Sequence, residues 1–419
     1  MKKRCALVST AEREAFRGNF RNFAGKIIIF MQTVTPNVRF IGVEDDNLDL
    51  FEGQYPIPGG ISYNSYLIDD DAIAVVDAVD SRRSADWLLK LARALDGRRP
   101  SYLVVQHVEP DHSGSIRELM IRYPEIKVVA TKKALEMLGN YFSDVDFKTC
   151  SVVAGDGDTL SLGRTTLRFI TAPMVHWPEV MVTFDETDGV LFSADAFGSF
   201  ASYNSAEAWN DEARRYYCNI VGKFGPSVQT LMKKLTGLSF GIVAPLHGPV
   251  LRDNLARYWQ LYDLWSRYEP ETRGVLVAYA SVYGGTAAAA RLLASMLDES
   301  ETAGEVVLLD LCRHDVSYAV SEAFRLGSMA LCSVTCDGGM FPAMSEFLHH
   351  LAAKNFRGRR VGLVENGSWA PAAAKAMRGM LGQMKDMEVL EPVVTIRSRL
   401  HPDDLDVLHD LSCALAAGE

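Results

Sequence analysis

The sequence predicts an α/β protein built from two domains. Its 419 residues suffice for two domains of about 100–200 residues each. With 48% apolar and 23% charged residues, the composition is that of an ordinary globular chain. Short strand candidates alternate with helical segments, which indicates layers of sheet and helix. The alternation becomes regular after about residue 270, and this change divides the chain.

Short apolar runs predict the strands of the first domain, from about Asn37 onward. They are residues 72–79, 102–105, 126–129, 166–170, 190–192 and 241–244. Residues 84–95 read as a helix, and so do residues 251–268, which Glu269 and Pro270 terminate. We therefore predict a first domain over 31–270, with residues 251–270 as a linker helix.

Residues 271–419 show five strand candidates with helices between them. The strands are 274–280, 305–311, 329–334, 360–365 and 389–396; the helices are 287–297, 345–354, 372–384 and one from residue 403. This alternation predicts a doubly wound parallel sheet, and in a flavodoxin-like order its ligand lies at the carboxyl ends of strands one, three and four.

Charge, cysteines and the N-terminus narrow the class of protein. A net charge of −10 argues against nucleic acid or an anionic membrane as partner. Seven scattered cysteines without C-x-x-C argue against a disulfide framework, a thiolate zinc site or a fused rubredoxin-type centre. Residues 1–30 carry no recognisable signal peptide and read as an extension, with Met31 as an alternative start. No apolar run reaches about 18 residues. We expect a cytoplasmic protein.

Four potential metal ligands fall within six residues, in the segment His107-Val108-Glu109-Pro110-Asp111-His112. This segment directly follows an apolar run. Three further candidates follow other strands, so that all are expected at one end of the sheets. The full set is His107, Glu109, Asp111, His112, His176, Asp195 and His247. It contains every histidine of the first 270 residues.

Four imidazoles and three carboxylates without a thiolate favour iron or manganese. One carboxylate can bridge two metals, which leaves open positions for a substrate. The layout resembles the metallo-β-lactamase superfamily, whose hydrolases usually carry H-x-H-x-D-H and bind zinc. Here Glu109 replaces the second histidine, and H-x-E-x-D-H followed by H, D and H resembles the flavodiiron proteins.

The resemblance implies a metallo-β-lactamase-like αββα sandwich with a diiron site. By position, His107, Glu109 and His176 would hold one iron, and Asp111, His112 and His247 the other, with Asp195 as the bridge. The segments 60–66 and 176–179 match the family as well. Trp177 and Tyr217 would line the pocket, or are simply core aromatics.

A second constellation lies in the second domain, where Ser281-Val282-Tyr283-Gly284-Gly285-Thr286 joins the first strand to a helix. Hydroxyls and glycines at a helix N-terminus form an anion cradle. Without G-x-G-x-x-G or G-K-[ST], flavin mononucleotide (FMN) is favoured over NAD or ATP.

Two later loops are expected to complete the flavin site: Val334, Thr335, Cys336, Asp337 and Gly338, and then Asn366, Gly367, Ser368 and Trp369. Trp369 offers a stacking surface. The family often has Asn in place of Gly285, and Pro-Thr-Tyr-Asn in place of residues 334–337. The chain thus lacks one aromatic and adds the charge of Asp337. Plain core packing is the favoured reading of Cys332 and Cys336.

The resemblance implies an oxidoreductase that reduces dioxygen to water, nitric oxide to nitrous oxide, or both. Electrons would pass from an external donor, rubredoxin or similar, through FMN to a two-iron site. It also implies a head-to-tail homodimer or dimer of dimers. Two alternatives remain open: a zinc hydrolase with an attached flavodoxin-like domain, and a non-catalytic redox sensor or electron carrier.

Overall fold

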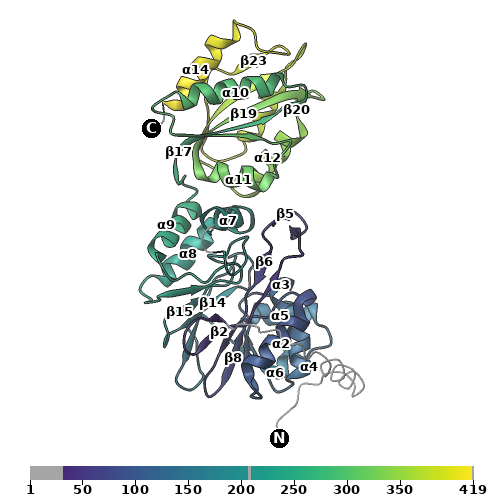
Figure 1. Ribbon diagram of the computed structural model, residues 1–419, viewed down its shortest axis with the longest axis vertical. Coiled ribbons are helices and arrows are strands. Elements are labelled where there is room, and N and C mark those ends of the chain that lie inside the picture. The colour runs from purple at the N-terminus through teal and green to yellow at the C-terminus, as the bar shows by residue number, and fades with distance from the viewer. Residues whose placement is uncertain (1–31, 206–208, 418–419) are drawn as a thin grey trace. The chain divides into compact units, whose positions relative to one another are not determined.

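The computed structural model describes residues 32–205 and 209–417 (Figure 1). The chain divides into two compact units. Of the described residues, 32–51, 57–205, 209–213 and 230–256 form the N-terminal unit, and 52–56, 214–229 and 257–417 form the C-terminal unit. The expected extension, residues 1–30, lies outside the described residues. The domain boundary at Pro270 stays a prediction. In the structure, residues 257–270 belong to the C-terminal unit.

A seven-stranded sheet forms one layer of the N-terminal unit, in the order β1-β2-β7-β8-β9-β10-β11. Its strands are β1 (Gln32–Thr33), β2 (Val38–Phe40), β7 (Tyr66–Ile68), β8 (Ile73–Val76), β9 (Pro100–Val104), β10 (Lys127–Ala130) and β11 (Ser151–Val153). The strands from β8 to β11 are parallel.

The second layer is a five-stranded sheet, in the order β12-β13-β14-β15-β16. Its strands are β12 (Thr159–Ser161), β13 (Thr166–Thr171), β14 (Met181–Asp185), β15 (Val190–Phe192) and β16 (Ile242–Ala244). Two small pairs complete the strands: β3 (Val43–Asp45) with β6 (Ile61–Tyr63), and β4 (Leu50–Phe51) with β5 (Tyr55–Pro56).

The two sheets share one core. Val76 and Val104 from the first sheet and Phe169, Met181 and Phe192 from the second belong to the same buried cluster. Inward-facing apolar side chains from two sheets thus form the sandwich that the sequence predicted.

Helices flank the first sheet: η1 (Ser81–Arg83), α2 (Ser84–Leu95), α3 (Pro110–Ser113), α4 (Ile116–Arg122), α5 (Lys132–Tyr141) and α6 (Phe147–Cys150). Helix α2 buries Trp87, Leu88, Leu91 and Leu95, which share one face at helical spacing. It ends at Asp96, whose φ of 44° is left-handed. The unit boundaries fall near α7 (Trp209–Tyr216), the helical turns η3 (Tyr217–Val221) and η4 (Gly222–Phe224), α8 (Gly225–Leu235) and α9 (Leu255–Ser266).

The C-terminal unit is a parallel sheet in the order β18-β17-β19-β21-β22, with β23 also beside β21. In chain order the strands run 2-1-3-4-5, which is the flavodoxin-like order. The elements are β17 (Thr272–Ala280), α10 (Gly285–Asp298), β18 (Glu305–Asp310), α11 (Val316–Arg325), β19 (Leu326–Cys336), β20 (Gly339–Met340), α12 (Pro342–Ala353), β21 (Arg359–Asn366), α13 (Ala373–Leu381), β22 (Met387–Val389), β23 (Val394–Ile396) and α14 (Asp404–Ala416).

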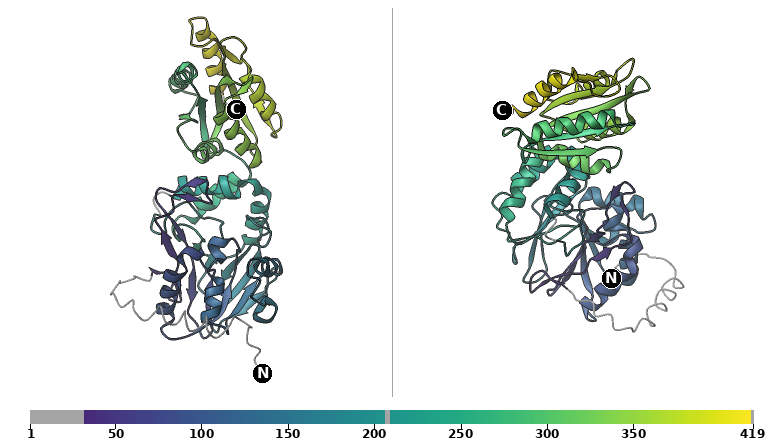
Figure 2. Two further views of the ribbon diagram at one scale, coloured as in Figure 1. Left: turned by 90° about the vertical axis from the view of Figure 1, so that its right-hand side faces the viewer. Right: turned by 45° about the horizontal axis from the view of Figure 1, so that its top comes forward.

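Helices cover both faces of this sheet. Helix α14, yellow in Figures 1 and 2, packs beside α10 on one face, and α11 and α12 lie on the other. Leu293 of α10 and Leu411 of α14 share a buried cluster with Val277 and Val364 of the sheet. The fold class is therefore confirmed for both units. Among the described residues, no helix is long and apolar enough to cross a membrane.

Most element predictions hold, and the exceptions have local causes. The strand expected over 389–396 is two strands, β22 and β23, separated by a segment with Pro392, which cannot donate to a ladder. The helix expected from residue 251 begins at Leu255, since Leu251 is bridged to Val243. The prediction missed β14, because the polar Thr183 interrupts its apolar pattern even though the strand is buried throughout.

Candidate metal centre

Four loops of the N-terminal unit carry the proposed metal ligands. The segment from His107 to His112 follows β9, and the remaining ligands, His176, Asp195 and His247, come after β13, β15 and β16. Strands β15 and β16 are parallel, and β13 runs in the same direction because β14 lies antiparallel between β13 and β15. Their carboxyl ends therefore meet at one edge, as the sequence predicted.

The first ligand group contains His107, Glu109, His176 and Asp195. His107 Nε2 lies 3.2 Å from Glu109 Oε2 and 3.3 Å from Asp195 Oδ2. His176 Nε2 lies 3.1 Å and 3.2 Å from the same two oxygens. Two imidazole nitrogens and two carboxylate oxygens thus surround a single point.

The second group contains Asp111, His112 and His247. Asp111 Oδ2 lies 3.3 Å from His112 Nε2 and 3.2 Å from His247 Nε2. The other oxygen of Asp195, Oδ1, lies 3.3 Å from His112 Nε2 and 3.8 Å from His247 Nε2. Asp195 therefore turns one oxygen toward each group, which is the geometry of a bridging carboxylate.

The donor set fits two metal ions. Ligand bonds of about 2.1 Å would place neighbouring donor atoms roughly 3.0–3.4 Å apart, close to the spacings found here. Several of these buried polar atoms, including both Asp111 oxygens and Asp195 Oδ1, have no hydrogen-bond partner among the described residues. Buried carboxylate oxygens without donors are costly unless a cation or another donor faces them.

Buried acceptors outside the ligand set orient two of the imidazoles. Glu179 Oε1 lies 2.8 Å from His107 Nδ1 and accepts a hydrogen bond from Val108 N. His247 Nδ1 lies 2.8 Å from the Ser62 carbonyl oxygen. Holding Nδ1 fixes each ring with Nε2 toward the centre. His112 differs, since its buried Nδ1 has no hydrogen-bond partner in the part of the chain that the structure describes.

Asp77 braces the loop that carries His107. Its carboxylate accepts hydrogen bonds from the backbone and side-chain amides of Gln106, at 2.8 and 3.0 Å, and from His107 N at 3.4 Å. Asp77 has a φ of 54°, and Ala194, directly before Asp195, has a φ of 52°. Left-handed backbone at non-glycine residues persists only where the surroundings enforce it, and such residues cluster at functional sites.

The close carboxylates and imidazoles shift one another's pKa values. Burial lowers the pKa of His107, but the charge of Asp195 and hydrogen bonds with Glu109 and Glu179 outweigh it and raise the pKa well above its ordinary value. Hydrogen bonds likewise outweigh burial at His176, whose pKa is raised to about 9. A cluster that holds protons this way releases them when a metal cation binds.

The two aromatic residues suggested as pocket residues lie in different surroundings. The indole of Trp177 meets the ring of His107 edge-on, with centroids 5.2 Å apart, and so belongs to the centre. The ring of Tyr217 lies in the C-terminal unit against Tyr262 and Trp265, at 5.1 and 5.4 Å. Core packing accounts for Tyr217.

The C-terminal unit brings the three expected flavin loops to one edge of its sheet. Helix α10 begins at Gly285, and a Cβ there would lie 2.1 Å from the Ser398 carbonyl oxygen. Asn366 exchanges two 3.0 Å hydrogen bonds with the backbone of Ser398. Thr335 Oγ1 accepts a hydrogen bond from Ala372 N. Only glycine fits at position 285, because the loop between β17 and α10 packs directly against the segment after β23 that contains Ser398.

Large apolar side chains stand exposed around these loops. Tyr283 is fully exposed, Trp369 is 87% exposed and Val282 is 49% exposed. Thr286, by contrast, is buried in the first turn of α10. Beside them, Asp337 has a left-handed φ of 48° in the turn between β19 and β20. A helix N-terminus flanked by exposed rings suits a phosphate joined to a planar ring system.

Residues 61–248 match the model of the ODP family beta lactamase. An anaerobic nitric oxide reductase flavorubredoxin of Aeromonas hydrophila is 30% identical over 360 residues, which cover 83% of this chain and 72% of the relative. The chain belongs to the flavodiiron protein family. The flavodiiron resemblance inferred from the ligand motif is thereby confirmed.

Solved structures of flavodiiron proteins share this fold. The rubredoxin oxygen:oxidoreductase of Desulfovibrio gigas is 25% identical, with a TM-score of 0.85 over 93% of this chain and 98% of its own. The flavodiiron protein of Giardia intestinalis is 24% identical, with a TM-score of 0.85 over 93% of this chain and 96% of its own. The likeness to the latter concerns the fold alone.

Sequence reasoning missed three residues of these sites. Glu179 was noted within a matching segment but was given no role, although it follows His176 by only three positions. Asp77 lies within the predicted strand 72–79 and directly follows β8, and a carboxylate inside an apolar run was a usable signal. Ser398 lies more than 100 residues from the phosphate loop, and nothing in its local sequence marks it.

Proposed function

We propose that this flavodiiron protein reduces nitric oxide to nitrous oxide, dioxygen to water, or both, at a two-iron site supplied with electrons through FMN. The observation that carries the proposal is Asp195, which faces one ligand group with each of its two oxygens. The names of its relatives, a nitric oxide reductase and a rubredoxin oxygen:oxidoreductase, point to the same two gases.

In this proposal His107, Glu109 and His176 hold one iron, Asp111, His112 and His247 hold the other, and Asp195 bridges them. When bound, a ferrous pair supplies electrons and open coordination positions for a small gas. The chain's own part is to fix the imidazoles through Glu179 and the Ser62 carbonyl and to keep bulk water from the buried donors. Three carboxylates offset three of the four positive charges that two ferrous ions would bring.

The C-terminal unit would hold FMN with its phosphate at the start of α10 and its ring system near Trp369 and Tyr283. Dioxygen needs four electrons and four protons to give two waters; two nitric oxide molecules need two of each to give nitrous oxide and water. An external donor, rubredoxin or a similar small redox protein, would supply these electrons. We place the protein in the cytoplasm.

A zinc hydrolase is the weaker alternative. Glu109 stands where the related hydrolases usually carry a histidine, and a carboxylate-rich mixture with imidazole favours iron over zinc. The exposed aromatic side chains at the flavin loops also have no use in hydrolysis. Metal identity separates the two functions.

We also propose a head-to-tail homodimer, in which the FMN of one subunit serves the metal centre of the other. Mixing two inactive variants tests this arrangement. Subunits with Asp195→Asn and subunits with Gly285→Ala, unfolded and refolded together, should regain part of the gas-reducing activity. No activity above that of each variant alone would contradict the arrangement.

Gas consumption tests the function itself. Iron-loaded protein, with chemically reduced FMN and an excess of reductant, should consume nitric oxide or dioxygen catalytically. The Asp195→Asn variant should lose at least about a hundredfold in rate, because both ligand groups lose an anionic donor. Glu136→Gln, an exposed substitution, is the matched control. Equal rates in all three proteins would refute the proposal.

A further inference from the structure

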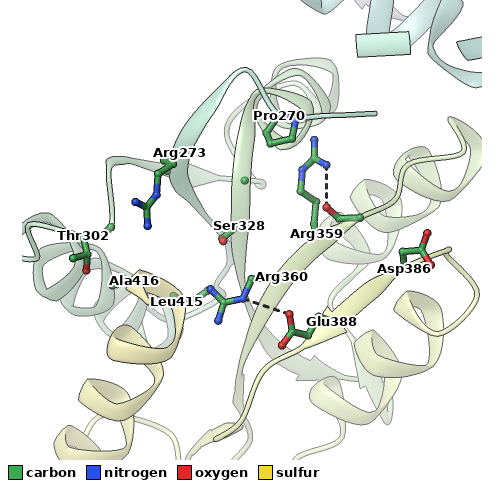
Figure 3. A pocket seen from close by; sticks show the side chains of 14 residues that line it. Pro270, Arg273, Thr302, Ser328, Arg359, Arg360, Asp386, Glu388, Leu415 and Ala416 are labelled. Carbon is green, nitrogen blue, oxygen red and sulfur yellow. Dashed lines mark hydrogen bonds and ion pairs between the residues drawn. The ribbon is translucent and has the colours of Figure 1, made fainter. Parts of the chain in front are cut away.

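A cavity of about 410 Å³ lies in the C-terminal unit, at the edge of the parallel sheet where the strands begin (Figure 3). Its walls come from the starts of β17, β19 and β21 and from the end of α14. The flavin loops follow the opposite ends of the same strands. Since β17 alone has nine residues, at about 3.3 Å each the two edges lie roughly 30 Å apart. The cavity is separate from the flavin site.

Arg359 gives the cavity a buried positive charge. This side chain is 2% exposed, and its guanidinium donates to backbone carbonyls, among them those of Leu326, Tyr268 and Phe324. Burial lowers its pKa to about 10. In the described part of the chain, no carboxylate lies within ion-pair distance of this guanidinium. A buried cation balanced only by dipoles leaves a positive potential in the adjoining hollow.

Arg360 uses only part of its hydrogen-bonding capacity. Its Nε lies 3.4 Å from Glu388 Oε2, and its Nη2 donates to the Ala414 carbonyl oxygen at 2.8 Å. The remaining nitrogen, Nη1, is buried and has no hydrogen-bond partner within residues 32–205 and 209–417. A buried donor without an acceptor is costly, and a small turn of the guanidinium would bring it to an anion in the cavity.

Two neighbouring strands add further donors to the lining. Ser328 stands in register with Arg360, and Val275 stands in register with Ser328. Arg273 comes two residues before Val275 and is exposed. Figure 3 shows the Arg273 and Arg360 side chains reaching from separate strands toward one hollow, with Ser328 between them. Thr302, on the loop before β18, adds a second hydroxyl to the lining.

The carboxylates of the lining do not cancel this charge. The side chains of Asp386 and Glu388 are 66% and 65% exposed, so water screens them. Guanidinium groups only donate hydrogen bonds, and their planar forks match phosphate and carboxylate oxygens. Leu415 and Ala416 supply an apolar wall. The volume lies within the range of pockets for small organic ligands.

We propose that this cavity binds a small organic oxyanion, a phosphomonoester or a polycarboxylate of metabolite size, between Arg273 and Arg360. The oxyanion accepts from the guanidinium groups of Arg360 and Arg273 and from the hydroxyl of Ser328, while the organic part lies against Leu415 and Ala416. Because the site lies on the far edge of the sheet from the flavin loops, binding leaves the flavin in place.

Calorimetric titration of the FMN- and iron-loaded protein tests this inference at constant ionic strength. The probes are 5′-AMP for the phosphomonoester and citrate for the polycarboxylate. At least one should bind saturably, and the tighter one identifies the source of the oxyanion. Arg273→Gln and Arg360→Gln should each weaken binding about tenfold or more, the loss of one charge-assisted hydrogen bond. Lys375→Gln removes an exposed charge outside the cavity and should bind like the wild type.

Two outcomes would overturn the proposal. One is the absence of saturable binding of either probe up to about 10 mM, which corresponds to less than roughly 3 kcal/mol of binding free energy. The other is binding to both arginine variants as tight as to Lys375→Gln. Arg273 is exposed, so Arg273→Gln remains informative if Arg360→Gln fails to fold. A flavin absorbance spectrum that stays unchanged on addition of the probe separates this site from the flavin site.

Discussion

Glu179 should control how firmly the first metal is held, although it is not a ligand itself. Its carboxylate lies 2.8 Å from His107 Nδ1 and 3.1 Å from Val108 N, and both Glu179 and His107 are buried. The substitution Glu179→Gln removes the charge but keeps one carbonyl acceptor of similar shape. His107 would then lose the anionic partner that fixes its ring and raises the basicity of Nε2.

The expected loss follows from the hydrogen bonds. A bond to a charged group contributes about 1.5–3 kcal/mol, against about 0.5–1.5 kcal/mol for a neutral pair. The two ranges differ by up to about 2.5 kcal/mol, or close to 70-fold in affinity, and the loss of such a partner of a ligand typically costs 10–100-fold in metal affinity. Only the first group should be affected, since Glu179 contacts His107 and not the second group.

Competition with a chelator under anaerobic conditions measures this loss. Iron-loaded wild type and Glu179→Gln are titrated with the chelator, and the iron that remains per chain is determined. The variant should release one iron at 10–100-fold lower chelator concentration and hold the other like the wild type. Glu136→Gln, an exposed change of the same chemistry, serves as the control. Unchanged retention, or equal loss of both irons, would refute the positioning role.

Three further predictions concern other parts of the molecule. Burial raises the pKa of Glu44 to about 7 from an ordinary 4.5. Between these two pH values the folded chain holds a proton that the unfolded chain has released, so the free energy of unfolding falls as the pH rises from 4.5 to 7. In urea unfolding, the free energy of unfolding of Glu44→Gln relative to that of the wild type should therefore increase by about 1–2 kcal/mol from pH 5 to pH 8, after allowance for partial exposure. No increase would contradict the pKa shift. Gly285→Ala should weaken FMN binding at least about tenfold in a fluorescence titration, because its Cβ would clash with the Ser398 carbonyl, whereas Gly379→Ala, with open space around it, should bind FMN normally. Asp195→Asn should lower the iron content in metal analysis to below about one per chain, because the bridging donor serves both groups; two retained irons would contradict the bridge.

The ligand set was accessible to sequence reasoning for a physical reason. Metal ligands need particular side chains, and a parallel arrangement places loops from separate strands at one edge. The segment from His107 to His112 therefore marked the candidate centre in the sequence. The strand pattern predicted that His176, Asp195 and His247 lie at the same edge. The second domain was predictable for a similar reason, because regular βα alternation permits few sheet orders.

Residues that act through backbone contacts were not accessible. The Ser398 carbonyl meets Gly285, and the Ser62 carbonyl holds His247, but any residue type offers a carbonyl. Tyr217 was predicted either to line the pocket or to be a core aromatic, and its ring packs against Tyr262 and Trp265. Aromatic side chains suit cores and sites equally well, so their type alone does not decide.

Metal and flavin analysis of protein purified without oxygen tests the central claim most directly. The arrangement of seven donors around Asp195, together with the flavin loops, predicts about two irons and one FMN per chain with little zinc. Two zinc ions without iron would contradict the redox function and favour the hydrolase instead.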